Sequence, residues 1–148
     1  MQEILCQIIT LTLNPALDVT TSVPALRPEE KLRSSAPRVD AGGGGINVAR
    51  AILALGGQAS ALIALGGPTG ERLLQALSET NLSLNLFPAP GETRQSLTLH
   101  EEATGAQYRI LMPGPTWRKR DAKALEARVR RLTPKGALVV ISGSQPAG

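Results

Sequence analysis

The spacing of apolar runs along the chain restricts its fold more than any other feature. Runs of strand length stand at 4–13 (ILCQIITLTL), 59–65 (ASALIAL) and 136–142 (GALVVIS), and segments with helical periodicity lie between them. Continuous apolar runs of this length are typical of strands buried within a sheet. Parallel strands need long crossover connections, usually helices, so the alternation predicts an α/β fold with a parallel sheet covered by helices. We expect 136–142 to be the most clearly buried strand and 84–87 to add a fourth.

Two helices are predicted in the first half of the chain. Apolar residues recur at helical spacing in 46–55 and again in 71–79. The pair Gly56-Gly57 is expected to end the first helix. The segment GGPTG (66–70) predicts a tight turn ahead of the second helix rather than a phosphate-binding loop.

Four other segments alternate loosely between apolar and polar residues. They are 17–23, 32–39, 93–101 and 106–112, and the last two flank Ala103-Thr104-Gly105, a hairpin-turn signal. Such alternation indicates strands with one face exposed to water. We expect these segments to form one accessory sheet set against the α/β core.

The segment 118–132 predicts a third helix with a strongly basic surface. Its basic side chains are Arg118, Lys119, Arg120, Lys123, Arg128, Arg130 and Arg131. Leu125, Val129 and Leu132 are expected to face the core, which leaves the basic residues as a solvated outer face. A nucleic-acid-binding helix is the alternative, but aromatic residues make up only 2% of the chain, too few for a surface on which bases stack.

Composition excludes several further classes. The 148 residues, 42% of them hydrophobic and 19% charged, suit one globular domain, and a net charge of +4 suits an anionic ligand. Cys6 and His100 are the only residues of their kinds, which excludes a Cys/His zinc site and a disulfide within the chain. The sequence has no apolar stretch of about 18 residues and no basic leader, so we expect no membrane span, no signal peptide and a cytoplasmic location.

Four consecutive glycines, Gly42 to Gly45, precede the first predicted helix. Glycine permits close backbone approach, and amides at a helix N-terminus bind anions or hydroxyl oxygens. Asn47 lies in the first turn and can reach the same ligand. A flexible loop is the other interpretation of the composition. The run is not a Walker A motif, because no Gly-Lys-Ser/Thr follows, and its spacing differs from a dinucleotide fingerprint.

Five further polar residues follow predicted strands or turns and can bind a ligand. Asp18 offers a carboxylate for sugar hydroxyls. Lys31 and Arg33 alternate in a proline-flanked segment, and the Arg94 guanidinium can bind a phosphate through two hydrogen bonds. Ser144 follows a predicted buried strand, at the end of a parallel sheet where ligands collect. Taken singly, each of them also suits an ordinary surface role.

Six segments together resemble the PfkB, or ribokinase-like, carbohydrate kinases, and most closely the minor bacterial 6-phosphofructokinases of that family. They are TLTLNPALD (10–18), EEKLR (29–33), GGGGINVARAI (42–52), TRQSL (93–97), EEATGAQYRILMPG (101–114) and VVISGSQPAG (139–148). The resemblance covers essentially the whole chain, in order. The unbroken GGGG is informative, because 1-phosphofructokinases and tagatose-6-phosphate kinases usually have lysine at the third position.

The resemblance implies a Rossmann-like α/β core with a small β lid. Residues 1–148 would form the N-terminal part of the kinase domain, with lid strands within about 16–40 and 92–113. The lids of two subunits are expected to clasp in a homodimer. The implied glycolytic reaction uses ATP and Mg²⁺ and transfers the γ-phosphate to O1 of fructose 6-phosphate. Phosphoryl transfer depends mainly on positioning and charge neutralisation, which suits these hydroxyl-binding residues and cations.

The resemblance also implies roles for single residues. The implied sugar-binding residues are Asp18, Gly43, Gly44 and Asn47. The residues implied to place the substrate phosphate are Arg94, Ser144 and the EEKLR segment, which contains Lys31 and Arg33. Lys31 would also reach the nucleotide phosphates, in its own subunit or in the partner.

One family signature is missing, the Gly-x-Gly-Asp motif that carries the catalytic aspartate. Asp18, Asp40 and Asp121 are the only aspartates of the chain, and none follows Gly-x-Gly. We therefore assign no catalytic residue and no metal ligand, and we expect the 148 residues alone to be inactive. The alternatives are a tagatose-6-phosphate or 1-phosphofructokinase-type kinase, or a non-catalytic remnant that binds a sugar phosphate or dimerises.

Overall fold

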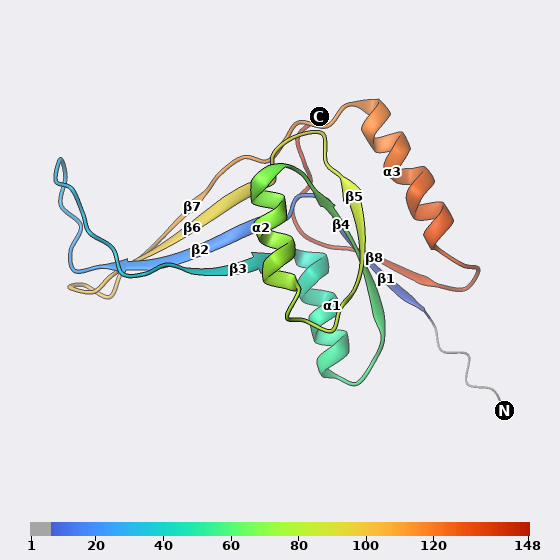
Figure 1. Cartoon of the computed structure of the whole chain (residues 1–148), viewed down its shortest axis with the longest axis horizontal. Helices are drawn as coiled ribbons and strands as arrows, with labels where there is room; N and C mark the ends of the chain where they lie inside the picture. Colours follow the sequence, from blue (N-terminus) through green and yellow to red (C-terminus); the bar gives the residue numbers. More distant parts are fainter. Residues whose placement is uncertain (1–6) are drawn as a thin grey trace.

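Residues 7–148, the part of the chain that the computed structural model describes, form two four-stranded sheets and three helices (Figure 1). Residues 4–6 of the first predicted strand, including Cys6, lie outside the described residues. The core sheet is surrounded by the helices, and the second sheet extends away from them (Figure 1). The α/β class predicted from the alternation of apolar runs and helices is confirmed.

The core sheet is parallel throughout and has the order β5-β4-β1-β8. Its strands are β1 (Ile8–Thr12), β4 (Ala59–Leu65), β5 (Ser83–Pro88) and β8 (Leu138–Ile141). The central strand β1 pairs with both neighbours from its first residue, since Ile8 lies opposite Ala59 on one side and Leu138 on the other. The strands predicted at 59–65, 84–87 and 136–142 therefore lie in one sheet with the first apolar run.

Two helices cover one face of the core sheet. They are α1 (Gly44–Ala54) and α2 (Gly67–Leu77), and they match the helices predicted at 46–55 and 71–79. Ile46 of α1 is fully buried in the same apolar cluster as Ile63 of β4 and Leu73 of α2. Burying one apolar stripe of each helix against alternate strand residues is what holds this layer together.

The third helix, α3 (Lys119–Leu132), covers the opposite face. Leu125 is buried against Leu11 and Leu62 of the sheet, and Val129 packs at the margin of the same cluster. The inward face predicted for this helix is confirmed, and most of its basic side chains are exposed. Helices thus cover both faces of the sheet at its inner strands β1 and β4, as parallel strands require.

The second sheet has the order β3-β2-β6-β7, with β2 and β6 parallel and the outer pairs antiparallel. Its strands are β2 (Ala16–Val23), β3 (Arg38–Gly42), β6 (Arg94–Glu101) and β7 (Gln107–Leu111). The prediction that the alternating segments form one accessory sheet is confirmed. This sheet is joined to the core where β3 leads into α1 (Figure 1).

Strand register gives the second sheet a polar face and an apolar face. Asp18 lies opposite Asp40 on one side and Ser96 on the other, and Leu97 lies opposite Ile110. The side chains of the polar face include Asp18, Asp40, Arg94, Ser96 and Arg109. The side chains of the apolar face include Leu17, Val19, Leu97, Leu99, Tyr108 and Ile110.

The strand predicted at 32–39 is wrong in position, because β3 begins only at Arg38. Pro37 has no N–H to donate to a ladder and interrupts the pairing. At Ser35, the backbone amide donates to the Ser22 carbonyl at 2.9 Å, while the Ser35 hydroxyl accepts a hydrogen bond from the Ser22 amide at 3.0 Å. One side-chain contact and one backbone contact thus hold the loop here in place of a regular ladder. Residues 24–37 therefore form an irregular loop before β3.

The turn predicted at 66–70 is also wrong, because α2 already begins at Gly67. Pro68 lies in the first turn of this helix, where the amide that proline lacks would have no helical partner anyway. The Glu92 carboxylate accepts a hydrogen bond from the Thr69 amide at 2.8 Å and so caps the helix from outside. Proline and glycine at this position mark a helix start rather than a turn.

The burial predicted for 136–142 is not observed. Leu138 and Ile141 of β8 are 53% and 58% exposed. β8 is an edge strand, and within residues 7–148 no further strand pairs with its outer side. An apolar run indicates that a strand is suited to burial, but neighbouring elements decide whether it is buried.

Candidate functional site

A cleft of about 320 Å³ opens where the N-terminus of α1 and the chain after β8 meet the polar face of the second sheet. Its lining residues are Asn14, Ala16, Asp18, Gly42, Gly43, Gly44, Asn47, Arg94, Ser96, Arg109, Leu111, Gly143 and Ser144. Six of the eight predicted binding residues are among them: Asp18, Gly43, Gly44, Asn47, Arg94 and Ser144. The volume lies at the lower end of the range for small-molecule pockets, roughly 300–1,000 Å³.

Close packing explains the glycine run. A β-carbon at Gly42 would overlap the carboxylate of Asp18, and one at Gly44 would overlap the backbone of Gly143. Gly43, which precedes the first residue of α1, has φ 151°, in the region that favours glycine. The backbone is therefore packed between Asp18 and the turn after β8, and the flexible-loop interpretation is wrong.

Not every amide of the glycine run faces the cleft. The amide of Gly45 donates to the Ser142 carbonyl at 3.1 Å, and that of Ile46 donates to the Thr12 hydroxyl at 3.0 Å. These contacts tie the start of α1 to the ends of β1 and β8. The Gly45 amide is therefore used within the fold, and the glycines that line the cleft are Gly42, Gly43 and Gly44.

Asp18 is the carboxylate of this cleft, and it stands among cations and hydrogen-bond donors. Burial raises the pKa of the Asp18 carboxyl above its ordinary value, and the nearby Asp40 carboxylate adds to this effect. The hydrogen bond from Ser96 and the charges of Arg94 and Arg109 oppose it. A partly desolvated carboxylate surrounded by donors can accept hydrogen bonds from the hydroxyl groups of a ligand.

Arg94, Asn14 and Ser144 form a connected cluster on the other side of the cleft. Arg94 donates through Nε to the Asn14 carbonyl at 3.2 Å and through Nη2 to the Ser144 hydroxyl at 3.3 Å. The Asn14 amide group donates to the same hydroxyl at 3.2 Å. The Ser144 oxygen thus accepts two hydrogen bonds, which leaves its own proton available for an acceptor such as a phosphate oxygen.

Sequence reasoning missed three polar residues of the cleft: Asn14, Ser96 and Arg109. Asn14 was visible as the residue that ends the first apolar run. Ser96 and Arg109 carry no local signal, because only the pairing of β6 with β2 and β7 brings them to the face of Asp18. A prediction of strand register would have been needed to find them.

Lys31 and Arg33 do not line the cleft. They lie exposed in the 24–37 loop, beyond the end of β2 that is remote from Asp18 (Figure 1). Since a strand rises about 3.3 Å per residue, the length of β2 from Asp18 to Val23 alone spans roughly 17 Å. The structure therefore places these two cations far from the cleft of their own chain.

Within residues 7–148, no three His, Cys, Asp or Glu side chains are grouped so that they could hold a metal ion. Across the same residues, no helix combines the length and the apolar character needed to cross a bilayer.

Comparison with known sequences identifies relatives over nearly the whole chain. The model of the pfkB family of carbohydrate kinases matches residues 8–148. The ATP-dependent 6-phosphofructokinase isozyme 2 of Mycobacterium tuberculosis is 46% identical over 142 residues, and that of Escherichia coli K12 is 48% identical over 142 residues. A 1-phosphofructokinase of Xanthomonas campestris and a tagatose-6-phosphate kinase of Staphylococcus epidermidis are less similar, at 35% and 31%.

Comparison with solved structures also finds a phosphofructokinase-2 among the similar proteins. The crystal structure of phosphofructokinase-2 from Escherichia coli in complex with fructose-6-phosphate superposes with a TM-score of 0.86 at 48% identity. The match covers 95% of this chain and 46% of that one. The alignments with the two isozyme 2 sequences cover 96% of this chain but only 42% and 46% of those sequences. The chain therefore spans less than half the length of these relatives.

Proposed function

Because this chain belongs to the pfkB family of carbohydrate kinases, we propose that it is the N-terminal part of an ATP-dependent 6-phosphofructokinase. The whole protein would transfer the γ-phosphate of ATP to O1 of fructose 6-phosphate. Greater similarity to 6-phosphofructokinases than to 1-phosphofructokinase or tagatose-6-phosphate kinase supports this choice of substrate. We further propose a cytoplasmic location.

The observation that carries the proposal is the composition of the cleft. One carboxylate, two guanidinium groups, two hydroxyl groups and two amide side chains converge there with the start of a helix. A carboxylate and an amide suit the hydroxyl groups of a sugar, and guanidinium groups suit a phosphate. An unphosphorylated sugar would leave the guanidinium groups unused, and a free anion would leave the carboxylate and the amides unused. A sugar phosphate uses both groups of side chains.

The sugar end of the ligand is proposed to lie against Asp18, Asn47, Gly43 and Gly44. Asp18 would accept hydrogen bonds from hydroxyl groups, and the two glycine amides would donate to sugar oxygens. The absence of side chains at Gly43 and Gly44 lets the ring approach the backbone. These contacts would orient O1, the oxygen to be phosphorylated.

The phosphate end is proposed to lie against Arg94, Arg109 and Ser144. Arg94 is already held by Asn14 and Ser144, so its guanidinium is preorganised. Arg109 reaches the same cleft from β7. Two cations around one phosphate dianion neutralise its charge and fix the other end of the substrate.

This chain is proposed to contribute binding and orientation rather than the chemical step. The three aspartates of the sequence include none in a Gly-x-Gly-Asp motif. A general base for the O1 proton and the remaining ATP contacts would therefore come from residues outside this chain. Mg²⁺ is expected to arrive with the nucleotide, because its ligands are largely phosphate oxygens and water.

The second sheet is proposed to act as the lid and as the contact between two subunits. Its apolar face is incompletely covered in one chain, since Tyr108 and Ile110 are 43% and 51% exposed. Pairing two such faces would bury this surface. Lys31 and Arg33, which lie far from the cleft of their own chain, would then be brought close to the partner subunit, where they can reach bound phosphates.

Calorimetric titration of the 148-residue chain with fructose 6-phosphate tests the proposal, with an Asp18→Ala variant as the control. We expect binding to the original chain and strongly weakened binding to the variant. A coupled assay with ATP and fructose 6-phosphate should show no turnover by the chain alone. The assignment is refuted if fructose 6-phosphate releases no heat, or if tagatose 6-phosphate binds more tightly.

The second candidate is a non-catalytic sugar-phosphate-binding or dimerising protein. The observation that favours it is that the chain holds the cleft but no Gly-x-Gly-Asp motif. The intact mass of the natural protein separates the two candidates. A mass near 15.5 kDa favours the non-catalytic protein, and about twice that mass favours the kinase.

A further inference from the structure

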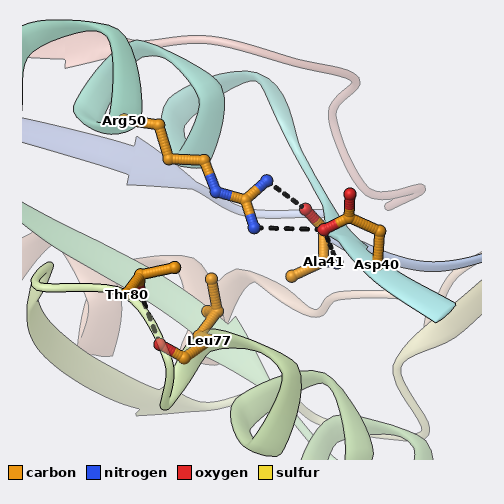
Figure 2. A network of polar contacts seen from close by, with 5 residues as sticks. All are labelled: Asp40, Ala41, Arg50, Leu77 and Thr80. Atoms are coloured by element: carbon orange, nitrogen blue, oxygen red, sulfur yellow. Dashed lines mark hydrogen bonds and ion pairs between the residues drawn. The ribbon is translucent and has the colours of Figure 1, made fainter. Parts of the chain in front are cut away.

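Arg50 links helix α1 to strand β3, which ends at Gly42, the first residue of the glycine run (Figure 2). Its guanidinium donates through Nη1 to the Ala41 carbonyl at 3.0 Å and through Nη2 to the Asp40 carboxylate at 3.2 Å. The same carboxylate oxygen accepts the Ala41 amide at 2.8 Å. One planar group thus holds both the backbone and the side chain of β3 immediately before Gly42.

The strand position that Arg50 holds is directly opposite the sugar-binding carboxylate. Asp40 and Asp18 are register partners in the antiparallel pair of β2 and β3, so both project from the same face. Two carboxylates placed in this way repel each other unless one of them is neutralised. Asp40 does not line the cleft, and its carboxylate turns to Arg50.

The Arg50 side chain is more buried than the arginine of an ordinary surface ion pair, although its partner Asp40 is 57% exposed. The Arg50 side chain is 30% exposed, against 77% for Arg130 in the ion pair with Glu126 on α3. The carbonyl of Ala41 gives the guanidinium a second acceptor, so its geometry is set at two points. A lysine at position 50 would supply the charge without this two-point geometry.

We propose that Arg50 is a positioning residue for Asp18: by holding the Asp40 carboxylate and the Ala41 carbonyl together, it keeps β3 and the glycine run in place and balances the charge beside Asp18. The proposal rests on the sugar-binding role assigned to Asp18. Arg50 itself does not line the cleft, so it would act on the ligand only through these neighbours.

The charges that face Asp18 predict how the effect depends on pH. They are Asp40 on β3, Arg94 on β6 and Arg109 on β7, and Ser96 on β6 supplies a hydrogen bond. Burial is the main cause of the raised Asp18 pKa, and Asp40 is the one of these charges that raises it further. Without Arg50, the full charge of Asp40 would act on Asp18, and the Asp18 carboxyl would take up a proton at a higher pH.

The test compares Arg50→Gln, the double variant Arg50→Gln/Asp40→Asn, and Asp40→Asn, with Arg130→Gln as the matched control for loss of an arginine. The Asp18 carboxyl is titrated by NMR in the free chain, so this readout does not need any ligand. We expect Arg50→Gln to move the Asp18 titration to higher pH and the double variant to return it to that of Asp40→Asn. Arg130→Gln should leave it unchanged.

Fructose 6-phosphate affinity supplies the second readout. We expect about two- to fivefold weaker binding in Arg50→Gln, the range for a partly exposed ion pair, with a larger loss at pH 5 than at pH 8. Compared with Arg50→Gln, Arg50→Lys should bring the Asp18 titration close to that of the original chain but restore the fructose 6-phosphate affinity only in part, because lysine supplies the charge without the two-point geometry. An Asp18 titration that is the same in Arg50→Gln and the original chain overturns the inference. Failure of the original chain to bind the sugar phosphate instead refutes the proposed function, and the NMR titration still decides the inference.

Discussion

Gly42 lies so close to Asp18 that a β-carbon at position 42 would overlap the Asp18 carboxylate. The two residues are on neighbouring strands, and Gly42 pairs with Ala16, two residues before Asp18. The carboxylate therefore occupies space that any other residue at 42 would fill. This contact joins the first of the four glycines to the carboxylate proposed to bind the sugar.

Gly42→Ala tests whether that space is needed. We expect the variant to lose about 1–3 kcal/mol of unfolding free energy, the usual cost of overpacking, and to bind fructose 6-phosphate more weakly because Asp18 is displaced. Chemical denaturation and calorimetry measure the two effects. Gly105→Ala is the control, since Gly105 has φ 70° and open space around it. Gly105→Ala should lose stability but keep its affinity for fructose 6-phosphate. Equal affinity of Gly42→Ala and Gly105→Ala for this ligand would contradict a role of the Gly42–Asp18 contact in binding.

Asp18→Asn is expected to stabilise the fold at neutral pH while weakening sugar binding. The pKa of Asp18 is raised in the folded state, chiefly by burial, so the folded chain holds this proton more tightly than the unfolded chain. The stability that Asp18 contributes is complete below its unfolded pKa of about 3.9 and is lost as the pH rises through the higher folded pKa. Asparagine does not ionise, so the variant does not lose this stability as the pH rises.

Unfolding of Asp18→Asn and the original chain at several pH values measures the difference. The advantage of the variant should be present at pH 7 and disappear below about pH 4. Its affinity for fructose 6-phosphate should fall roughly ten- to a hundredfold, the cost of losing a charged hydrogen-bond acceptor. A variant less stable than the original chain at pH 7 would show that the ionised carboxylate is favourable in the fold.

Arg109→Ala is expected to reduce affinity for fructose 6-phosphate roughly ten- to a hundredfold, because a charge-assisted contact to the phosphate is lost. Affinity for fructose itself, which has no phosphate, should not change. Binding by the original chain should weaken with added salt more than binding by the variant. Calorimetry at two salt concentrations measures this, with Arg128→Ala on α3 as the control. Equal losses for both sugars would exclude a phosphate contact.

Glu101→Gln is expected to loosen the 24–37 loop at neutral pH. The Glu101 carboxylate accepts the Leu26 amide at 2.8 Å and the Thr104 hydroxyl at 2.6 Å, and the Thr104 hydrogen bond is the main reason that its pKa is lowered. The stability from a lowered pKa is present above the unfolded value of about 4.3 and is lost as the pH falls through the folded pKa. The variant should therefore match the original chain in acid.

Hydrogen exchange at Leu26 measures this loosening directly. Exchange should be faster in Glu101→Gln at pH 7. Glu102→Gln is the neighbouring control: its carboxylate contacts the Ser22 hydroxyl at 2.6 Å rather than the amide of Leu26. Unchanged exchange at Leu26 in Glu101→Gln would show that other contacts hold the loop.

The sequence predicts the elements of this fold well and their surroundings less well. The periodicity of apolar residues located α1, α2, α3 and the core strands. This was possible because the periodicity typical of a buried strand or helix can be recognised within one short continuous segment. It failed at β3, where Pro37 moves the strand past the alternating segment. It also failed for the burial of β8, because an edge position depends on which strands are present beside it.

The candidate site divides in the same way. The glycine run, Asp18, Asn47, Arg94 and Ser144 were visible in the sequence because each is a chemically distinct residue beside a strand end, a turn or a helix start. Ser96 and Arg109 were not, since their place in the cleft follows from the register of β6 and β7.

By itself, the order of residues determined the class of fold, the family to which the chain belongs and most of the polar groups that can meet a sugar phosphate. Only the tertiary structure decided which of those groups share one cleft, that Lys31 and Arg33 lie away from it, and that Arg50 reaches Asp40. The physical reason is that periodicity and side-chain chemistry are local properties, whereas register, edge position and contacts between distant segments depend on how whole elements pack.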